Sequence, residues 1–176
     1  MAGDEPDSAT FTLLVALLAP RSRGRVRLSA PQPEAPVLIE PAYLSDTDDL
    51  RRVIAGVGLA RSVAATPPLA GYLIEERWAG AGILGDRELA RAVRADVMPY
   101  HHPVGTARMG RGDDPCAVVD HTGRVHGVTG LYVVDASIMP TIPSANTNVA
   151  TLMIAEHLAP HVAWRRARSA VTQELS

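Results

Sequence analysis

Cysteine is scarce in this sequence, and there is no excess of positive charge. Its 176 residues include a single cysteine, Cys116, which excludes an intramolecular disulfide and a Cys-x-x-Cys metal site. The net charge at pH 7 is −2, whereas a domain that binds nucleic acid would present a basic surface. The rest of the composition, 47% hydrophobic and 20% charged residues, is typical of a globular protein that is long enough to bury a core.

Long apolar runs are also missing. The run near the start, Phe11–Ala19, is much shorter than the about 20 residues that a membrane-spanning helix needs. The residues before it, 3–7, include acids where a secretory signal would be basic. We therefore expect a soluble protein without a membrane span, in the cytoplasm because nothing suggests secretion. We interpret Phe11–Leu18 as a buried strand that is covered on both faces.

Two motifs that would indicate other functions are not found. Gly56 and Gly58 could begin a dinucleotide fingerprint, but Arg61 stands where the third glycine is needed, and a helix is predicted where a strand should precede. No Gly-x-Ser-x-Gly sequence occurs, so Ser137 and Ser144 have no hydrolase context.

The adjacent histidines His101 and His102 raise the question of a metal site. Neighbouring residues on an extended segment point to opposite sides, so at most one of the two would face a site. No carboxylate-rich or thiol-rich set completes a ligand shell. We therefore expect no metal.

The hydrophobic pattern predicts both strands and helices. Arg25–Ser29 alternates polar and apolar residues, and we expect it to form an antiparallel hairpin with Phe11–Leu18. The arginines of this hairpin could bind an anion, or they could be a solvated edge that discourages aggregation. Residues 45–48 supply a capping side chain and first-turn acids for a helix over Asp48–Ala64. The other expected elements are the strands Val37–Glu40 and Ala117–Asp120 and the helix Asp86–Arg94.

Polar residues gather within the segment Gly130–Ala159, between an expected strand and an expected helix. The apolar strand Leu131–Val134 ends in Asp135-Ala136-Ser137, and a loop with two prolines follows. Asn146-Thr147-Asn148 then precedes the apolar run Val149–Ala159, which has helical spacing. The free amides and positive dipole of a helix N-terminus suit an anion or an electron-rich ring.

A second polar cluster lies upstream, in Tyr100–Gly110. Pro103 restricts His102 to an extended backbone, and Gly105-Thr106 would allow another surface to approach closely.

Together the two segments resemble the C-terminal signatures of the glucose–methanol–choline (GMC) family of flavin-dependent alcohol oxidoreductases. The motifs are HPVGTARMG at 102–110, VVDASIMP at 133–140 and NTNVATLMIAE at 146–156, within a resemblance that spans roughly residues 11–162. The implied fold is α+β: a mainly antiparallel sheet packed with helices, plus a C-terminal strand–loop–helix segment that would complete a flavin domain.

The resemblance also implies roles for single residues. Alcohol oxidation removes a hydroxyl proton, which an imidazole can accept, and a hydride, which must pass to a cofactor, here FAD. In the family a His and a second His or Asn flank the substrate, which implies His102 and Asn146 as catalytic residues and His101 as turned away. Asn148 is the alternative to Asn146 for the catalytic role. The resemblance implies instead that Asn148, together with Val149, contacts the flavin.

Further flavin contacts are implied for Asp135 and Ala136, which match the segment that touches the flavin chain; the alternative for Asp135 is a carboxylate that caps a nearby loop. Ala107 replaces a cysteine that is frequent in the family, with no loss of a proton carrier. The family's glycine-rich strand–turn–helix is missing from this sequence. FAD is therefore expected to bind only together with a complementary flavin-binding domain.

We thus expect a disordered segment 1–10, a GMC C-terminal domain at 11–162 and a basic, loose tail at 163–176. The expected partners are an alcohol substrate and a separate or missing FAD-binding domain, and the expected function is oxidation of the CH–OH group of an alcohol. The alternative is a catalytically inactive remnant that acts as a binding or interaction module through apolar surface left exposed.

Overall fold

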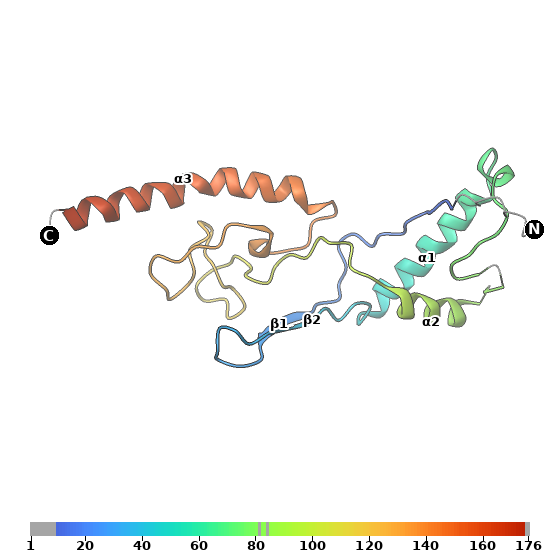
Figure 1. The fold of residues 1–176 in the computed structure, drawn as a ribbon, viewed down its shortest axis with the longest axis horizontal. Helices are drawn as coiled ribbons and strands as arrows, with labels where there is room; N and C mark the ends of the chain where they lie inside the picture. The colour runs from blue at the N-terminus through green and yellow to red at the C-terminus, as the bar shows by residue number, and fades with distance from the viewer. Residues whose placement is uncertain (1–9, 81, 84, 175–176) are drawn as a thin grey trace, which may run out of the picture. The chain divides into compact units, whose positions relative to one another are not determined.

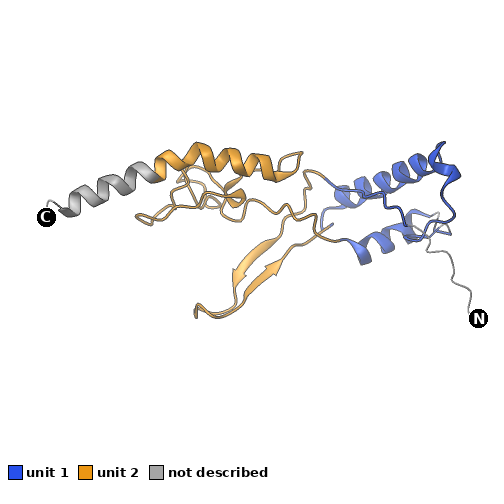
Figure 2. Cartoon of the chain, turned by 45° about the horizontal axis from the view of Figure 1, so that its top comes forward, with its two compact units in different colours: residues 1–17, 44–97 blue, residues 18–43, 98–176 orange. Residues whose placement is uncertain are grey.

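The computed structural model describes residues 10–80, 82–83 and 85–174, with side chains described as far as Val162. The chain divides into two compact units (Figure 2). Unit 1 comprises Met1–Leu17 and Leu44–Val97, and unit 2 comprises Leu18–Tyr43 and Met98–Ser176. Within the described ranges, no helix is both long and apolar enough to cross a membrane.

Unit 1 is built on two helices, α1 (Thr47–Ala64) and α2 (Asp86–Asp96) (Figure 1). The Asp46 side chain caps α1 by accepting a hydrogen bond of 2.8 Å from the Asp48 amide, which satisfies one of the free donors of the first turn. Both helices were predicted from their spacing, and both are confirmed. A short 3₁₀ helix, η1 (Leu69–Gly71), lies between them in the chain. The core of the unit consists of Leu44, Leu50, Val57, Leu89 and Val93.

The predicted buried strand at Phe11–Leu18 is wrong. Residues 10–17 form no strand, and Phe11 and Leu14 are 58% and 68% exposed. Val15 packs against α1, where a Cβ added to Gly56 would lie 2.5 Å from its Cγ1 atom. An apolar run becomes a strand only where a neighbouring backbone pairs with it, and the expected partner pairs elsewhere.

That partner, β1 (Arg25–Leu28), pairs antiparallel with β2 (Val37–Glu40), with Arg25 opposite Glu40. The strand at 37–40 is confirmed, and the pairing predicted for 25–29 is corrected. Arg25 and Arg27 both donate to the Glu40 carboxylate. The hydrogen bond from Arg27, followed by that from Arg25, lowers the Glu40 pKa below its usual value. Two arginines of the hairpin are thus engaged in ion pairs.

The rest of unit 2 is a set of turns around a small core of Val119, Ile138 and Leu158. The strands predicted at Ala117–Asp120 and Leu131–Val134 are not formed: Val119 and Tyr132 take part in isolated bridges. The turn after Asp120 explains the short pairing. Asp120 Oδ1 accepts hydrogen bonds from the amide and hydroxyl of Thr122, at 2.8 and 2.6 Å, and from the Arg124 amide at 3.2 Å. Partial burial raises the Asp120 pKa, but these hydrogen bonds outweigh it and lower the pKa to about 2.

The last helix, α3, spans Thr147–Glu174 and is preceded by the short 3₁₀ helix η2 (Ala136–Ile138) (Figure 1). It continues beyond the apolar run from which it was predicted. The described sheet has two antiparallel strands, and the helices make up the rest of the regular structure, so the α+β class is confirmed. The boundaries expected at 10/11 and 162/163 stay predictions, because residues 1–9 and the side chains after Val162 lie outside the described part of the chain.

Candidate active site

The two polar segments identified in the sequence lie side by side in unit 2. Gly105 N–H donates to the Ala136 carbonyl at 3.4 Å, Ala107 N–H to Ser137 at 3.0 Å and Met109 N–H to Ile138 at 2.8 Å. This ladder of backbone hydrogen bonds aligns the segment after His102 with the segment that begins at Asp135. Segments about thirty residues apart in the sequence therefore form one surface.

Gly105 permits this close approach. Its φ of +81° lies in the left-handed region, and a Cβ there would lie 3.3 Å from the Met139 carbonyl oxygen. On its other side, the strip formed by residues 105–109 contacts the segment around Val118, because the Val118 amide donates to the Arg108 carbonyl at 2.9 Å. The strip is thus held from two sides, which fixes the path of the backbone that leads from His102.

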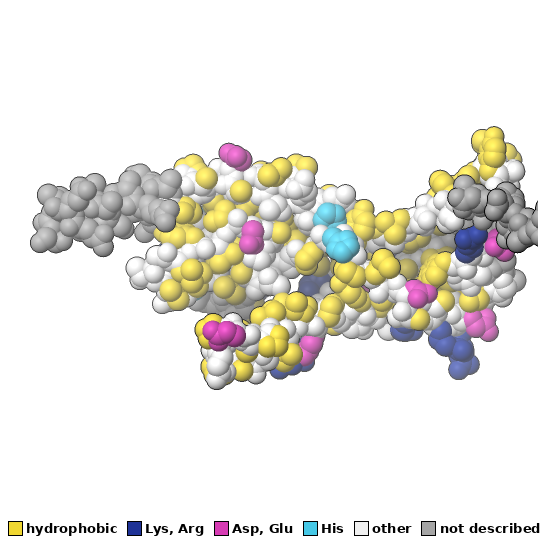
Figure 3. All heavy atoms as spheres, in the orientation of Figure 1, with side chains coloured by type: hydrophobic (Ala, Val, Ile, Leu, Met, Phe, Trp, Pro, Cys, Tyr) yellow, Lys and Arg dark blue, Asp and Glu magenta, His cyan; other side chains and the backbone are white. Residues whose placement is uncertain are grey.

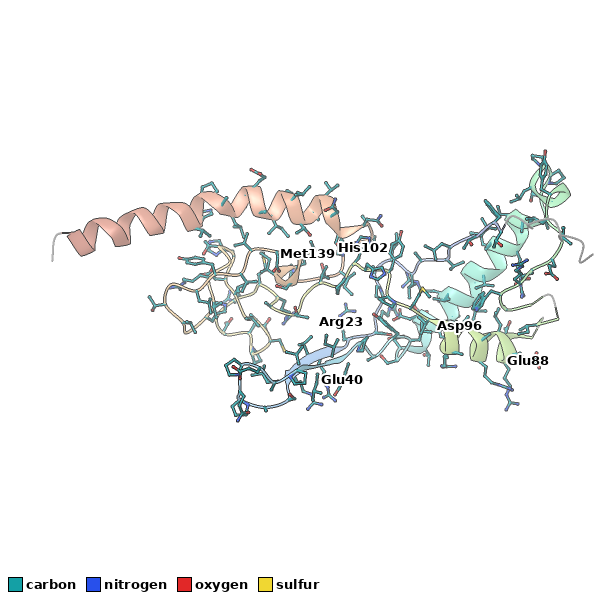
Figure 4. All side chains as sticks on the ribbon, viewed as in Figure 1. Arg23, Glu40, Glu88, Asp96, His102 and Met139 are labelled. Carbon is teal, nitrogen blue, oxygen red and sulfur yellow. The ribbon has the colours of Figure 1, made fainter. Side chains whose placement is uncertain are left out.

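His102 contacts the start of α3. Its Nδ1 atom lies 2.9 Å from Oγ1 of Thr147, and Figure 4 shows His102 beside the first turn of this helix. Thr147 is 6% exposed, and His102 is half-buried. The ring of Tyr100 packs edge-on against the imidazole, with centroids 5.0 Å apart and planes at 73°. His101, by contrast, is exposed and has a φ of +59°.

The residues that flank Thr147 are Asn146 and Asn148, and both side chains are exposed. The contact with Thr147 therefore brings His102 to the residue that directly follows Asn146 in the chain. The hollow in unit 2 that is lined by Met109, Arg111, Asp113, Asp120, His121 and His126 contains neither His102 nor Asn146. The candidate site is thus not part of that hollow.

The Asp135 side chain caps η2. Its Oδ1 atom accepts a hydrogen bond of 2.8 Å from the Ser137 amide, which is the capping role that the sequence left open as an alternative. Asp135 is nevertheless exposed, and the adjacent Ala136 is half-buried. A cap made by one carboxylate oxygen is compatible with contact to a ligand through the other.

An apolar surface continues from the site along α3. Val149 is 76% exposed, and Leu152 and Met153 are 59% exposed each. Ile154 and Leu158, on the opposite side of the helix, pack against the core of unit 2. Figure 3 shows hydrophobic side chains on the surface over the described part of this helix. An apolar patch beside a polar site indicates a surface on which something binds.

Comparison with known proteins establishes the family. A family model described as GMC oxidoreductase matches residues 20–155, a range that contains all the described contacts of His102. The chain belongs to the GMC oxidoreductase family. It is 41% identical over 149 residues to an alcohol dehydrogenase [acceptor] of Pseudomonas putida, a match that covers 85% of this chain and 27% of that protein.

Other members of the GMC family are similar to the same extent. A 5-(hydroxymethyl)furfural oxidase of Methylovorus sp. (strain MP688) is 43% identical over 169 residues, covering 89% of this chain and 32% of the relative. The crystal structure of pyridoxine 4-oxidase from Mesorbium loti superimposes with a TM-score of 0.74 at 37% identity, covering 81% of this chain and 28% of that chain. This GMC chain thus spans about a third or less of the length of the proteins it matches.

The sequence did not reveal the contact between His102 and Thr147. The two residues are 45 positions apart, and neither hydrophobic spacing nor a helix cap links them. The Asn-Thr-Asn motif contains Thr147, but the resemblance assigns roles to its two asparagines and none to the threonine between them. Among the described residues, no group of three or more His, Cys, Asp or Glu side chains could hold a metal ion.

Proposed function

We propose that this chain carries the substrate-side residues of an FAD-dependent alcohol oxidoreductase. His102 accepts the hydroxyl proton of the alcohol, and Asn146 holds its oxygen. FAD, when bound, would supply the acceptor for the hydride that leaves the carbon. The observation that carries this proposal is the 2.9 Å contact between His102 Nδ1 and Thr147 Oγ1, because Thr147 directly follows Asn146.

The chemistry follows from the two side chains. With Nδ1 engaged by Thr147, Nε2 is the nitrogen of His102 that remains for proton exchange with a substrate. Imidazole is the side chain that most readily gains and loses a proton near neutral pH. The Asn146 amide is neutral, and its N–H groups can donate to the alcohol oxygen as negative charge develops there.

The residues proposed to hold FAD fit that group. Asp135 and Asn148 are exposed polar side chains, and Val149 is an exposed apolar one. Ala136, on η2, adds a small residue that lets another surface approach. The amides in the first turn of α3 have no acceptor within the helix, so they suit the electron-rich edge of a flavin.

The proposed partners are an alcohol and a complementary FAD-binding domain. The relatives include proteins described as an alcohol dehydrogenase and a 5-(hydroxymethyl)furfural oxidase, which supports an alcohol as the substrate class. The exposed Val149, Leu152 and Met153 support a protein partner, because neighbouring apolar side chains that form an exposed patch are a mark of a protein–protein interaction site.

The test is to combine this chain with the flavin-binding portion of a GMC relative and to follow bleaching of the flavin when an alcohol is added without oxygen. His102→Ala should lower the rate of reduction by about 10² to 10⁴, the usual contribution of a general base, with unchanged flavin content. His101→Ala is the matched control, because it removes an adjacent but exposed imidazole. Equal rates for the two variants would remove His102 from the reaction.

The same assay distinguishes the role of Asn146 from that of Asn148. Asn146→Ala should slow reduction while flavin is retained, whereas Asn148→Ala should release flavin more readily and change the rate less. The reverse pattern would give the catalytic role to Asn148.

The exposed apolar face of α3 also supports a second candidate, a binding module without catalysis. A combined protein that assembles and retains flavin, yet shows no reduction with any alcohol, would favour this alternative.

A further inference from the structure

The contact that brings His102 to α3 gives a defined role to Thr147. We propose that Thr147 is a positioning residue: its hydroxyl oxygen accepts a hydrogen bond from Nδ1–H of His102, which leaves Nε2 as the unprotonated nitrogen. This role rests on the proposed function, because only a proton-accepting His102 requires one particular tautomer.

The hydroxyl is held firmly in place. Thr147 is the first residue of α3 and is 6% exposed. Its carbonyl accepts a hydrogen bond of 2.8 Å from the Thr151 hydroxyl, which adds a contact between the first and second turns. A β-branched side chain in a helix has few χ1 rotamers. The oxygen that faces His102 therefore has little freedom to move away.

The imidazole is restrained on the other side. The Tyr100 ring packs against it edge-on at 5.0 Å, and Pro103 restricts the backbone that carries it. Within the described part of the chain, Thr147 is the hydrogen-bond partner of His102. One hydrogen bond and one ring contact therefore set the orientation of the ring together.

A hydroxyl suits this position chemically. Its oxygen can accept from Nδ1–H both when the imidazole is neutral and when Nε2 has gained a proton. The hydroxyl carries no charge, so the same hydrogen bond persists through proton uptake without an ion pair beside the site. A fixed partner on one ring nitrogen is the general way in which proteins determine which nitrogen reacts.

The direct test is the tautomer of His102 in the full chain, read from the two imidazole ¹⁵N chemical shifts by long-range ¹H–¹⁵N NMR. The measurement is made at about pH 9, where an ordinary imidazole is neutral, and the His102 signals are those lost in His102→Asn. Wild type should show mainly the Nδ1–H form. Thr147→Val should shift the tautomer ratio toward Nε2–H by roughly tenfold, the size expected for one hydrogen bond.

Two variants control for effects on the fold. Thr147→Ser keeps the hydroxyl and should restore the wild-type tautomer. Thr141→Val makes the same hydroxyl-to-methyl change at an exposed threonine of the loop before α3 and should leave the His102 signals as they are. The backbone amide spectrum reports in each case whether the chain remains folded.

Dominance of Nε2–H in wild type would overturn the proposal, and this result does not depend on the folding of any variant. An unchanged ratio in a folded Thr147→Val protein would overturn it as well. The tautomer is measured without flavin or alcohol, so the two proposals fail separately. If wild type shows the expected tautomer but the His102→Ala enzyme is fully active, the proposed function alone is refuted. If wild type shows the opposite tautomer and the His102→Ala enzyme is inactive, the role of Thr147 alone is refuted.

Discussion

Replacing Gly123 with alanine adds one methyl group at a place where the backbone leaves no room for it. The φ of Gly123 is +78°, and a Cβ there would lie 2.6 Å from the Val133 carbonyl oxygen. The Val133 amide also donates to the Gly123 carbonyl at 2.8 Å. The methyl group would therefore push apart the contact that leads the chain into Asp135 and the candidate site.

The loss of stability expected for Gly123→Ala has two contributions, and a substitution at a second glycine, Gly127, allows them to be measured separately. A left-handed φ costs a residue with a Cβ roughly 1–2 kcal/mol, and forced overpacking adds about 1–3 kcal/mol. Gly127 has a φ of +74°, but nothing lies within 4 Å of a Cβ added there. Gly127→Ala should thus show the first cost alone, and Gly123→Ala should show both.

The assay is urea unfolding of the full chain, followed by circular dichroism, with the free energy of unfolding extrapolated to water. We expect Gly123→Ala to be the less stable variant by at least about 1 kcal/mol. Equal stabilities of the two variants would show that the turn moves away from Val133 at no cost, and the rigid support inferred for the site would be refuted.

Three further predictions concern the core, the response to acid and the cofactor. Leu158 is 3% exposed and packs against Val119 and Ile138, so Leu158→Ala should lower the free energy of unfolding by about 2–5 kcal/mol; Leu152→Ala, at a position 59% exposed, should change it by less than about 0.5 kcal/mol, and similar losses in both would contradict the assigned core. The Asp120 pKa is lowered from 3.8 to about 2, so its ionised form stabilises the fold by about 2 kcal/mol above pH 4. That contribution should disappear as the pH falls from about 4 to 2: the stability difference between wild type and Asp120→Asn, measured by urea unfolding, should shrink over this range, and a constant difference would be contrary evidence. Finally, the purified chain should bind FAD weakly or not at all, because its sequence contains no glycine-rich phosphate-binding turn; a yellow chain that retains FAD through gel filtration would show that reasoning to be wrong.

Local signals predicted the helices well. The capping side chain of Asp46 and the apolar spacing that follows it specify α1, and the same kind of spacing specifies α2. Pairing of strands is not a local property, and here the sequence misled. Phe11–Leu18 is apolar enough for a strand, yet β1 pairs with β2, because spacing along one segment does not determine which backbone lies beside it.

The same distinction holds at the candidate site. The motifs around His102 and Asn146 indicated the family and the chemistry, and the family is now established by the match over residues 20–155. The role of Thr147 could not be predicted from the sequence, because it comes from a contact across 45 positions. Asp135 has a capping role in the structure, which a motif alone could not separate from a role in binding.

The central claim is that His102 and Asn146 act on the same alcohol hydroxyl group. It is tested most directly by a double-mutant cycle of His102→Ala and Asn146→Ala in the chain combined with a flavin-binding domain, with the rate of flavin reduction as the measured quantity. Two residues that serve one hydroxyl group should be strongly coupled, so the double variant should lose clearly less than the product of the two single losses. Single losses that multiply fully, or a rate that His102→Ala leaves unchanged, would contradict the claim.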